Sequence, residues 1–339
     1  MRLHQSPRAV AVFLAGALLC GSGAAHAFGS GDDRGSAGFK GLLLISGARI
    51  AALGGACVAL PENPTSFAVN PASLGTLTKR HVSLSATDYV LDILPVGGMV
   101  AYPSAYGVWS VAVNNLSYGE FDRVDEFAGD QGTFSANDIV FHVGWARTWR
   151  YGISGGLSLG WVRSSIAEYS ASAFVANFGL LWETNDRQTA VGLSATNLGG
   201  AFSSYLGGDQ GMKDDVPSAF HVGLMHRPAH FPVPLSLLAD VTLPRDDEAT
   251  LSLAAEAQPV GPLYVRVGYN SLVRYVSSVG PDNTRDRRLA LDDRRTGGFG
   301  GLGLAMGMGI VWRQFGLDYA YGLAGPFGSV HHLTAHLLW

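Results

Sequence analysis

The last fourteen residues, 326–339 (PFGSVHHLTAHLLW), constrain this chain most, because two kinds of side chain alternate along them. One row contains Leu333, Leu337 and Trp339 and is mostly apolar, whereas the row between is mostly polar. Such alternation predicts a β-strand with one apolar face. A strand at the end of a chain can find its partner in the first strand, which closes a barrel. The last strand of a soluble sheet is the alternative.

The composition favours a membrane protein built of strands. Hydrophobic residues make up 47% of the 339 residues and charged residues only 15%, which is low for a soluble globular chain. After the N-terminal segment there is no run of about eighteen uncharged apolar residues, so we expect no membrane-spanning helix. Alternating strands need no such run, because only every second side chain faces lipid.

Residues 1–27 have the pattern of a cleavable secretory signal peptide, with a basic start, an apolar stretch over 9–19 and Ala-His-Ala at 25–27. Cys20 could instead suggest a lipoprotein anchor, but a leucine rather than a small residue precedes it. Without this segment Cys57 is the only cysteine, so no intramolecular disulfide is expected. The remaining 21 basic and 27 acidic residues give a formal charge of −6, which does not favour nucleic acid as a partner.

From residue 80 onward, short alternating segments are separated by turn residues, and we expect fourteen strands. In one segment Ile139, Phe141 and Val143 share a face, while smaller or polar residues share the other. A soluble sandwich would carry charges on its outer face, so lipid outside and a lumen inside fit better. The strands are expected to begin near His81, Val96, Gly107, Asp138, Gly152, Ala173, Thr189, Ala219, Pro234, Ala249, Leu263, Gly298, Phe315 and Ser329.

Loop lengths provide a second test, because outer-membrane barrels have short periplasmic turns and longer extracellular loops. If the first strand runs outward, the three long connections, 122–135, 201–216 and 271–297, are all extracellular. The prediction is therefore an all-β protein, a transmembrane antiparallel β-barrel of about 14 strands formed by residues 80–339. Its expected location is the outer membrane of a Gram-negative bacterium.

Residues 28–79 lack a two-residue period and are expected to form a plug, because a barrel this wide cannot be filled by its own inward side chains. The plug contains GARIAALGGACVALPENPTSFAVNPASLG at residues 47–75. Within it, Gly54 and Gly55 allow a turn with positive φ or a close approach to the barrel wall. Arg49 is expected to pair with a carboxylate inside the barrel rather than to contact a ligand.

The end of this motif predicts a short helix. Asn70 can cap the helix through its side-chain oxygen, Pro71 suits the first helical position because it has no N–H, and Ala72 favours continuation.

This motif resembles the N-terminal signature of PorV/PorQ-like proteins, members of the wider FadL-type outer-membrane barrels. Val69 and Ser73 depart from the signature, which usually has an aromatic residue and a glycine at these positions. Trp339 also resembles the C-terminal signal that the barrel assembly machinery reads, with Leu333 and Leu337 on the same face. The matching plug positions are Gly47, Ala48, Arg49, Gly54, Gly55, Asn70, Pro71 and Ala72.

The resemblance implies two functions. In the FadL-type branch the barrel admits hydrophobic small molecules, which bind near the plug and leave through the wall or the lumen. In the PorV/PorQ branch, which the signature resembles more closely, the barrel binds secretion-system components for protein export and surface attachment. Other expected partners are outer-membrane lipid and lipopolysaccharide. A barrel that mainly stabilises the envelope is a third alternative.

No motif predicts an active site, a cofactor or a metal site. The string at 298–303 matches a dinucleotide fingerprint but follows a charged loop and opens no helix. His332 and His336 share a strand face about 13 Å apart, too far to share a metal ion, and are interpreted as solvated or interface residues. The arginines of 271–297 are expected to form internal ion pairs rather than to bind lipopolysaccharide phosphates. The acidic loop 122–135 does not follow the ligand order of an EF-hand.

Overall fold

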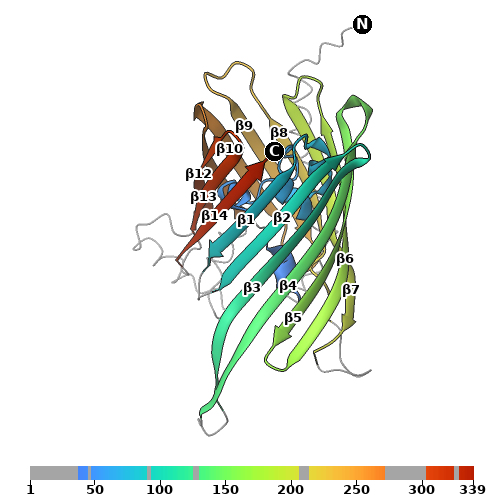
Figure 1. Cartoon of the computed structure of the whole chain (residues 1–339), viewed down its shortest axis with the longest axis vertical. Coiled ribbons are helices and arrows are strands. Elements are labelled where there is room, and N and C mark those ends of the chain that lie inside the picture. Colours follow the sequence, from blue (N-terminus) through green and yellow to red (C-terminus); the bar gives the residue numbers. More distant parts are fainter. Residues whose placement is uncertain are drawn as a thin grey trace.

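The computed structural model describes residues 37–44, 47–89, 93–124, 130–205, 214–271, 303–323 and 328–339. Fourteen antiparallel strands close into one barrel in chain order, with β1 paired to β14, which confirms the predicted fold class (Figure 1). The predicted signal peptide lies outside the described residues. The strands are β1 His81–Asp88, β2 Leu94–Ser104, β3 Gly107–Val124, β4 Asp130–Thr148, β5 Ile153–Ile166, β6 Tyr169–Glu183, β7 Thr189–Ser203, β8 Ala219–His226, β9 Leu235–Pro244, β10 Thr250–Val260, β11 Leu263–Asn270, β12 Leu304–Trp312, β13 Phe315–Leu323 and β14 Ser329–Leu338.

The expected long loop at 122–135 is mostly strand. β3 continues to Val124 and β4 already begins at Asp130, so the two form a long hairpin that projects from one end of the barrel (Figure 1). The rings of Phe121 and Phe134 stack across this hairpin with centroids 5.4 Å apart. The sequence pattern missed this part because a hairpin beyond the lipid faces water on both sides and loses its apolar alternation. Of the loop at 271–297, only Ser271 is described.

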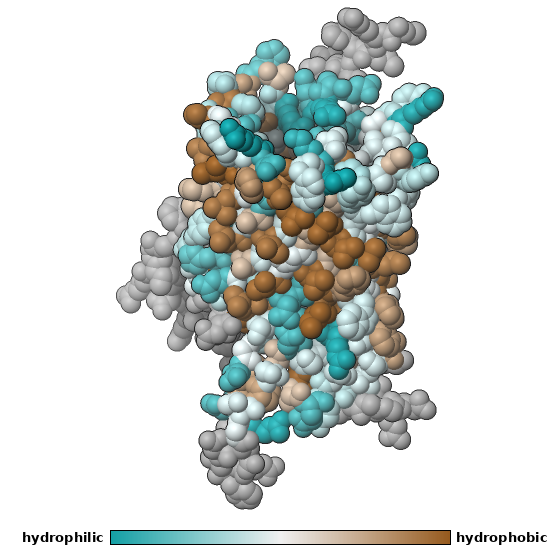
Figure 2. Space-filling view, viewed as in Figure 1, coloured by the Kyte–Doolittle hydropathy of each residue, from teal (hydrophilic) through white to brown (hydrophobic). Residues whose placement is uncertain are grey.

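The outer surface carries an apolar band with hydrophilic surface on both sides of it (Figure 2). Its side chains are the outward rows of the strands, such as Val111 and Val113 on β3 and Leu180 on β6, each roughly half exposed. None of the helical segments among the described residues is long and apolar enough to cross a membrane. Tryptophans gather at the end with the short turns, where Trp109, Trp145, Trp149, Trp182, Trp312 and Trp339 lie at or next to strand ends.

The plug consists of short helical segments inside the barrel (Figure 1): η1 Lys40–Leu43, α2 Ala48–Ala52, η2 Pro64–Ala68 and η3 Pro71–Thr76. On one side α2 packs against β11 to β14, and on the other η3 packs against β3 to β6. The helix predicted to start at Pro71 is present as the 3-10 helix η3. Asn70 caps it as predicted, since its side chain accepts a hydrogen bond from the N–H of Ala72. Gly54 and Gly55 turn the chain after α2 with φ of 61° and 88°.

Lumen-facing glycines of the wall let the plug backbone approach closely. A Cβ at Gly192 on β7 would overlap the carbonyl oxygen of Val58, and one at Gly268 on β11 would overlap the backbone of Leu53 and Gly54. The plug therefore fits into hollows that only glycine leaves open. Other wall glycines with plug atoms in the place of a Cβ are Gly156, Gly179, Gly223 and Gly307.

The barrel closes where β1 pairs with β14, and Trp339 extends this pairing beyond β14. Its N–H donates to the carbonyl of Arg80 at 3.2 Å, and the N–H of Arg80 donates to the carbonyl of Trp339 at 3.0 Å. We expect deletion of Trp339 to lower the amount of heat-modifiable barrel in the outer membrane, because two closing hydrogen bonds and an interfacial ring are lost together. Trp312→Ala, which removes an equally placed ring from β12, is the control. Unchanged barrel levels after the deletion would contradict a role in closure.

Candidate functional site: a plug between two lumen chambers

A buried ionic network ties α2 to the barrel wall. Arg49 donates two hydrogen bonds to Glu256 on β10, at 2.8 and 2.7 Å. Glu256 also accepts from Arg266 on β11 at 2.6 Å, and Arg266 donates to Asp318 on β13 at 2.6 Å. His336 on β14 lies 3.4 Å from Asp318. Two guanidinium groups thus alternate with two carboxylates, and Glu256, Arg266 and Asp318 are buried. Unpaired charges at buried positions are strongly unfavourable.

The expected partner of Arg49 is therefore Glu256. Burial alone would lower the pKa of the Arg49 guanidinium, but the charge and hydrogen bonds of Glu256 outweigh it, and the pKa is raised above its ordinary value. Arg49 consequently stays charged, and its two parallel hydrogen bonds fix the direction of the side chain. This ion pair, here called the ionic clasp, attaches α2 of the plug to β10.

Two further carboxylates hold plug backbone. Asp240 on β9 accepts hydrogen bonds from the N–H groups of Cys57 and Val58 at 2.6 and 2.8 Å. Asp138 on β4 accepts one from the N–H of Gly41 at 3.2 Å. Sequence reasoning did not single out Asp240 as a candidate. The available signal was the one charged residue of this strand, which lies on its inward row.

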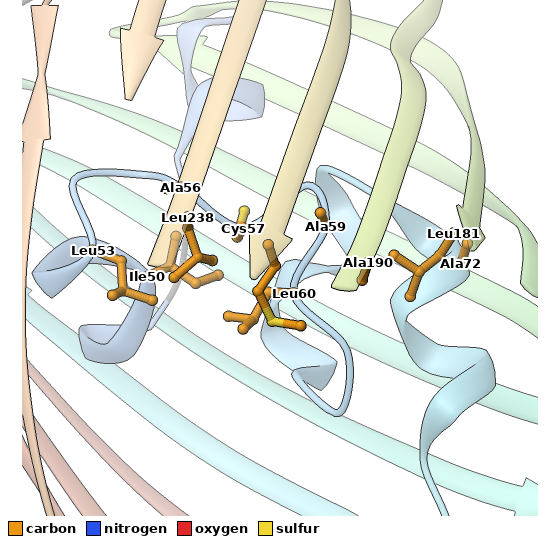
Figure 3. Close-up of a cluster of buried hydrophobic side chains, with 11 residues drawn as sticks. Ile50, Leu53, Ala56, Cys57, Ala59, Leu60, Ala72, Leu181, Ala190 and Leu238 are labelled. Carbon is orange, nitrogen blue, oxygen red and sulfur yellow. The ribbon is translucent and has the colours of Figure 1, made fainter. Parts of the chain in front are cut away.

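Apolar contacts seal the plug against β6 to β9. Ile50 and Leu60 of the plug belong to one buried cluster with Leu181 and Leu238, whose side chains point from the strands toward the plug (Figure 3). Cys57 lies in the same cluster, and burial raises the pKa of its thiol well above the ordinary value. The thiol is therefore protonated and shielded while the plug is seated.

The motif residues lie in one body inside the lumen but do not surround one pocket. Gly47, Ala48 and Arg49 start α2, and the N–H of Ala48 donates to Thr334 on β14 at 2.8 Å. Gly54 and Gly55 follow α2 beside β11 and β10. By contrast, Leu333 and Leu337 of the predicted closure signal lie on the outward row of β14 together with Trp339.

Asn70 joins three parts of the molecule. Besides capping η3, its side-chain N–H groups donate to the carbonyl of Val58 in the plug at 2.6 Å and to that of Leu180 in β6 at 3.2 Å. Pro71 and Ala72 are buried directly against the wall, where Gly156 leaves room for their backbone.

On one side of the plug lies a mostly apolar cavity of about 340 Å³, here called the outer chamber. It lies toward the end of the barrel opposite the short turns, where β1 ends and β14 begins. The plug contributes Leu43, Leu44, Ile50, Ala51, Gly54 and Gly55, and the wall contributes chiefly Tyr89, Pro95, Val96, Leu304, Leu323 and Val330, with Ser85, Thr87, Asn114, Asn270 and His332 as polar groups.

On the other side lies a cavity of about 460 Å³ with several charged side chains in its lining, here called the inner chamber, near the short turns. The ionic network faces it, including Arg49, Glu256 and His336. His336 also stacks on His81 with ring centroids 5.4 Å apart, while His332 lines the outer chamber and bonds Thr87 at 2.9 Å. The two histidines, interpreted from sequence as solvated or interface residues, thus lie in different chambers.

The fold resembles that of known hydrocarbon channels. A TodX variant described as a monoaromatic hydrocarbon channel aligns with a TM-score of 0.54 and 11% identity over 86% of this chain and 97% of that chain. The toluene transporter TodX of P. putida gives 0.52 and 10% over 86% and 96%, and the monoaromatic hydrocarbon channel CymD gives 0.50 and 11% over the same shares. At these identities the likeness shows the fold alone. No protein-family model and no curated protein matches the chain.

Proposed function

We propose that this chain is a channel for hydrophobic small molecules in the outer membrane of a Gram-negative bacterium. The observation that carries the proposal is the outer chamber, an apolar cavity bounded by the plug. Its volume of about 340 Å³ lies within the range of about 300–1,000 Å³ typical of small-molecule pockets. The substrate class is small and apolar, such as a monoaromatic hydrocarbon, the class named for TodX and CymD.

The arrangement of the chambers supports transport over simple envelope stabilisation. An apolar chamber on the outer side can take up a hydrophobic molecule from water, because burial of apolar surface is favourable. The inner chamber, whose lining includes the charged groups of the ionic network, offers less of this attraction and so favours release. A barrel that only stabilises the envelope would need neither cavity.

The PorV/PorQ-type function, export or attachment through protein partners, is the second candidate and rests on the plug motif. An apolar pocket beside the plug is the feature expected of a transporter, whereas partner binding would require an exposed apolar patch on the long loops. Most of those loops, 206–213 and 272–302, lie outside the described residues. The pocket therefore favours the FadL-type function.

The test is uptake of radiolabelled toluene by cells of a toluene-degrading bacterium whose own hydrocarbon channels are deleted. Cells producing this chain should accumulate label faster than cells carrying an empty vector, most clearly at low toluene concentration, where passive entry is slow. An equally abundant unrelated porin is the control for general leakiness. Equal rates in all three strains would contradict the proposal.

A further inference from the structure

A third, very small cavity lies between the two chambers, and we call it the throat. Its volume is about 20 Å³. It shares Leu44, Ser85, Gly97 and Asn114 with the outer chamber, and Thr65 with the inner chamber. The three cavities thus form a row that passes the plug on one side.

The inward row of β1 follows this succession of cavities. His81 lines the inner chamber, Ser83 the throat, Ser85 both the throat and the outer chamber, and Thr87 the outer chamber. Because alternate residues of a strand lie roughly 7 Å apart, the row covers the full depth of the plug. Small or polar side chains line this part of the wall throughout.

At three described places on the other side the plug touches the wall directly. On β7 the backbone of Val58 occupies the space in front of Gly192, and on β8 the Cβ of Val58 and the N–H of Ala59 lie in front of Gly223. On β11 the backbone of Leu53 and Gly54 lies in front of Gly268. The gap beside β1, β2 and β3, here called the seam, is therefore less tightly packed than these three contacts.

The wall beside the seam is closed. β1 pairs without interruption with β14 from His81 to Asp88, and β2 pairs with β3 over its whole length from Leu94 to Ser104. Each strand edge is occupied by its neighbour, so the described backbone leaves no opening toward the lipid at this place. A molecule in the outer chamber that moved along the seam would stay in the lumen.

We propose that hydrophobic cargo passes the plug along this seam, with the throat as its constriction and Met99 as the side chain that limits its width. The inference rests on the proposed function and specifies a route for it, through the lumen. A cavity of about 20 Å³ has room for roughly one water molecule, so the structure represents a closed channel. Met99 narrows the throat from β2, opposite Phe67 and Thr65 of the plug.

Two substitutions test the throat, one expected to widen it and the other to narrow it. Met99→Ala should raise toluene uptake about threefold or more and Ser83→Leu should lower it by a similar factor, because each changes a water-sized gap by several methyl groups. Matched controls exist on the outward rows of β12 and β6, where Met308→Ala and Ser170→Leu make the same changes at positions that touch neither the plug nor any of the three cavities. The controls should not reproduce these opposite changes.

Ion conductance of the purified proteins in planar bilayers is the second measurement, because it reports the width of the throat without reference to cargo. Uptake by the wild type with no response to either throat variant would overturn the route and leave the proposed function intact. Conductance that follows the throat variants, with no toluene uptake by any protein, would overturn the proposed function instead. Retained heat-modifiability shows for each variant that the barrel is folded.

Discussion

Replacing Glu256 with Gln is expected to release the plug from β10. The neutral amide leaves Arg49 without its buried anion and removes one of two anions from Arg266, whose side chain is 3% exposed. Removal of one partner from a buried ion pair costs about 3–5 kcal/mol, and 3 kcal/mol corresponds to a more than hundredfold change in an equilibrium. The population with a displaced plug should rise accordingly. The measurement is the rate at which a maleimide labels Cys57, the only cysteine outside residues 1–27.

Glu168→Gln is the matched control, because Glu168 forms an ion pair with Arg123 in which both side chains are about half exposed. Exposed pairs contribute about 0–1 kcal/mol, so Cys57 labelling should stay at the wild-type rate. Arg49→Ala should have a smaller effect than Glu256→Gln, since Glu256 then keeps Arg266. Equal labelling of wild type and Glu256→Gln would show that the ionic clasp does not hold the plug.

The barrel was predictable because its signal is local. Every second side chain of a spanning strand faces lipid, so rows such as Ile139, Phe141 and Val143 indicate both the strand and its outward face. This alternation of side chains stops where the strands extend beyond the lipid. Beyond the apolar band both faces of the β3–β4 hairpin meet water, and Asp122, which pairs with Thr133 across it, could not be recognised as strand.

For the plug contacts, the sequence predicted the type of partner but not which residue it is. A lone arginine in a glycine-rich segment indicates a buried carboxylate partner, but Glu256 lies 207 residues away and only the closed barrel brings the two together. The same is true of Asp240 and the N–H of Cys57. A charged residue on the inward row of a strand is the usable signal, and Glu256, Arg266 and Asp318 all satisfy it. The chambers themselves depend on side-chain packing and have no sequence signal.

Gly192→Val is expected to unseat the plug while leaving the barrel intact. Gly192 pairs regularly with Leu181 across to β6, and valine is favoured over glycine in strands, so the wall itself should not weaken. The new side chain would instead occupy the position of the Val58 carbonyl. Overpacking costs about 1–3 kcal/mol when side chains can adjust, and here backbone must move. We expect open-channel conductance in planar bilayers and faster labelling of Cys57.

Gly200→Val on the same strand separates this effect from a general effect on β7, because a Cβ at Gly200 meets no atom within 4 Å. Its conductance and Cys57 labelling should match those of the wild type. If Gly192→Val opened the channel and Glu256→Gln did not, the fit of plug backbone to wall glycines would determine the seal, and the ionic clasp would only orient α2. If instead Glu256→Gln opened the channel and Gly192→Val did not, the buried ion pairs would keep the channel closed, and the fit to the wall glycines would not determine the seal. A closed channel in both variants would require that the apolar cluster around Leu60 holds the plug without either.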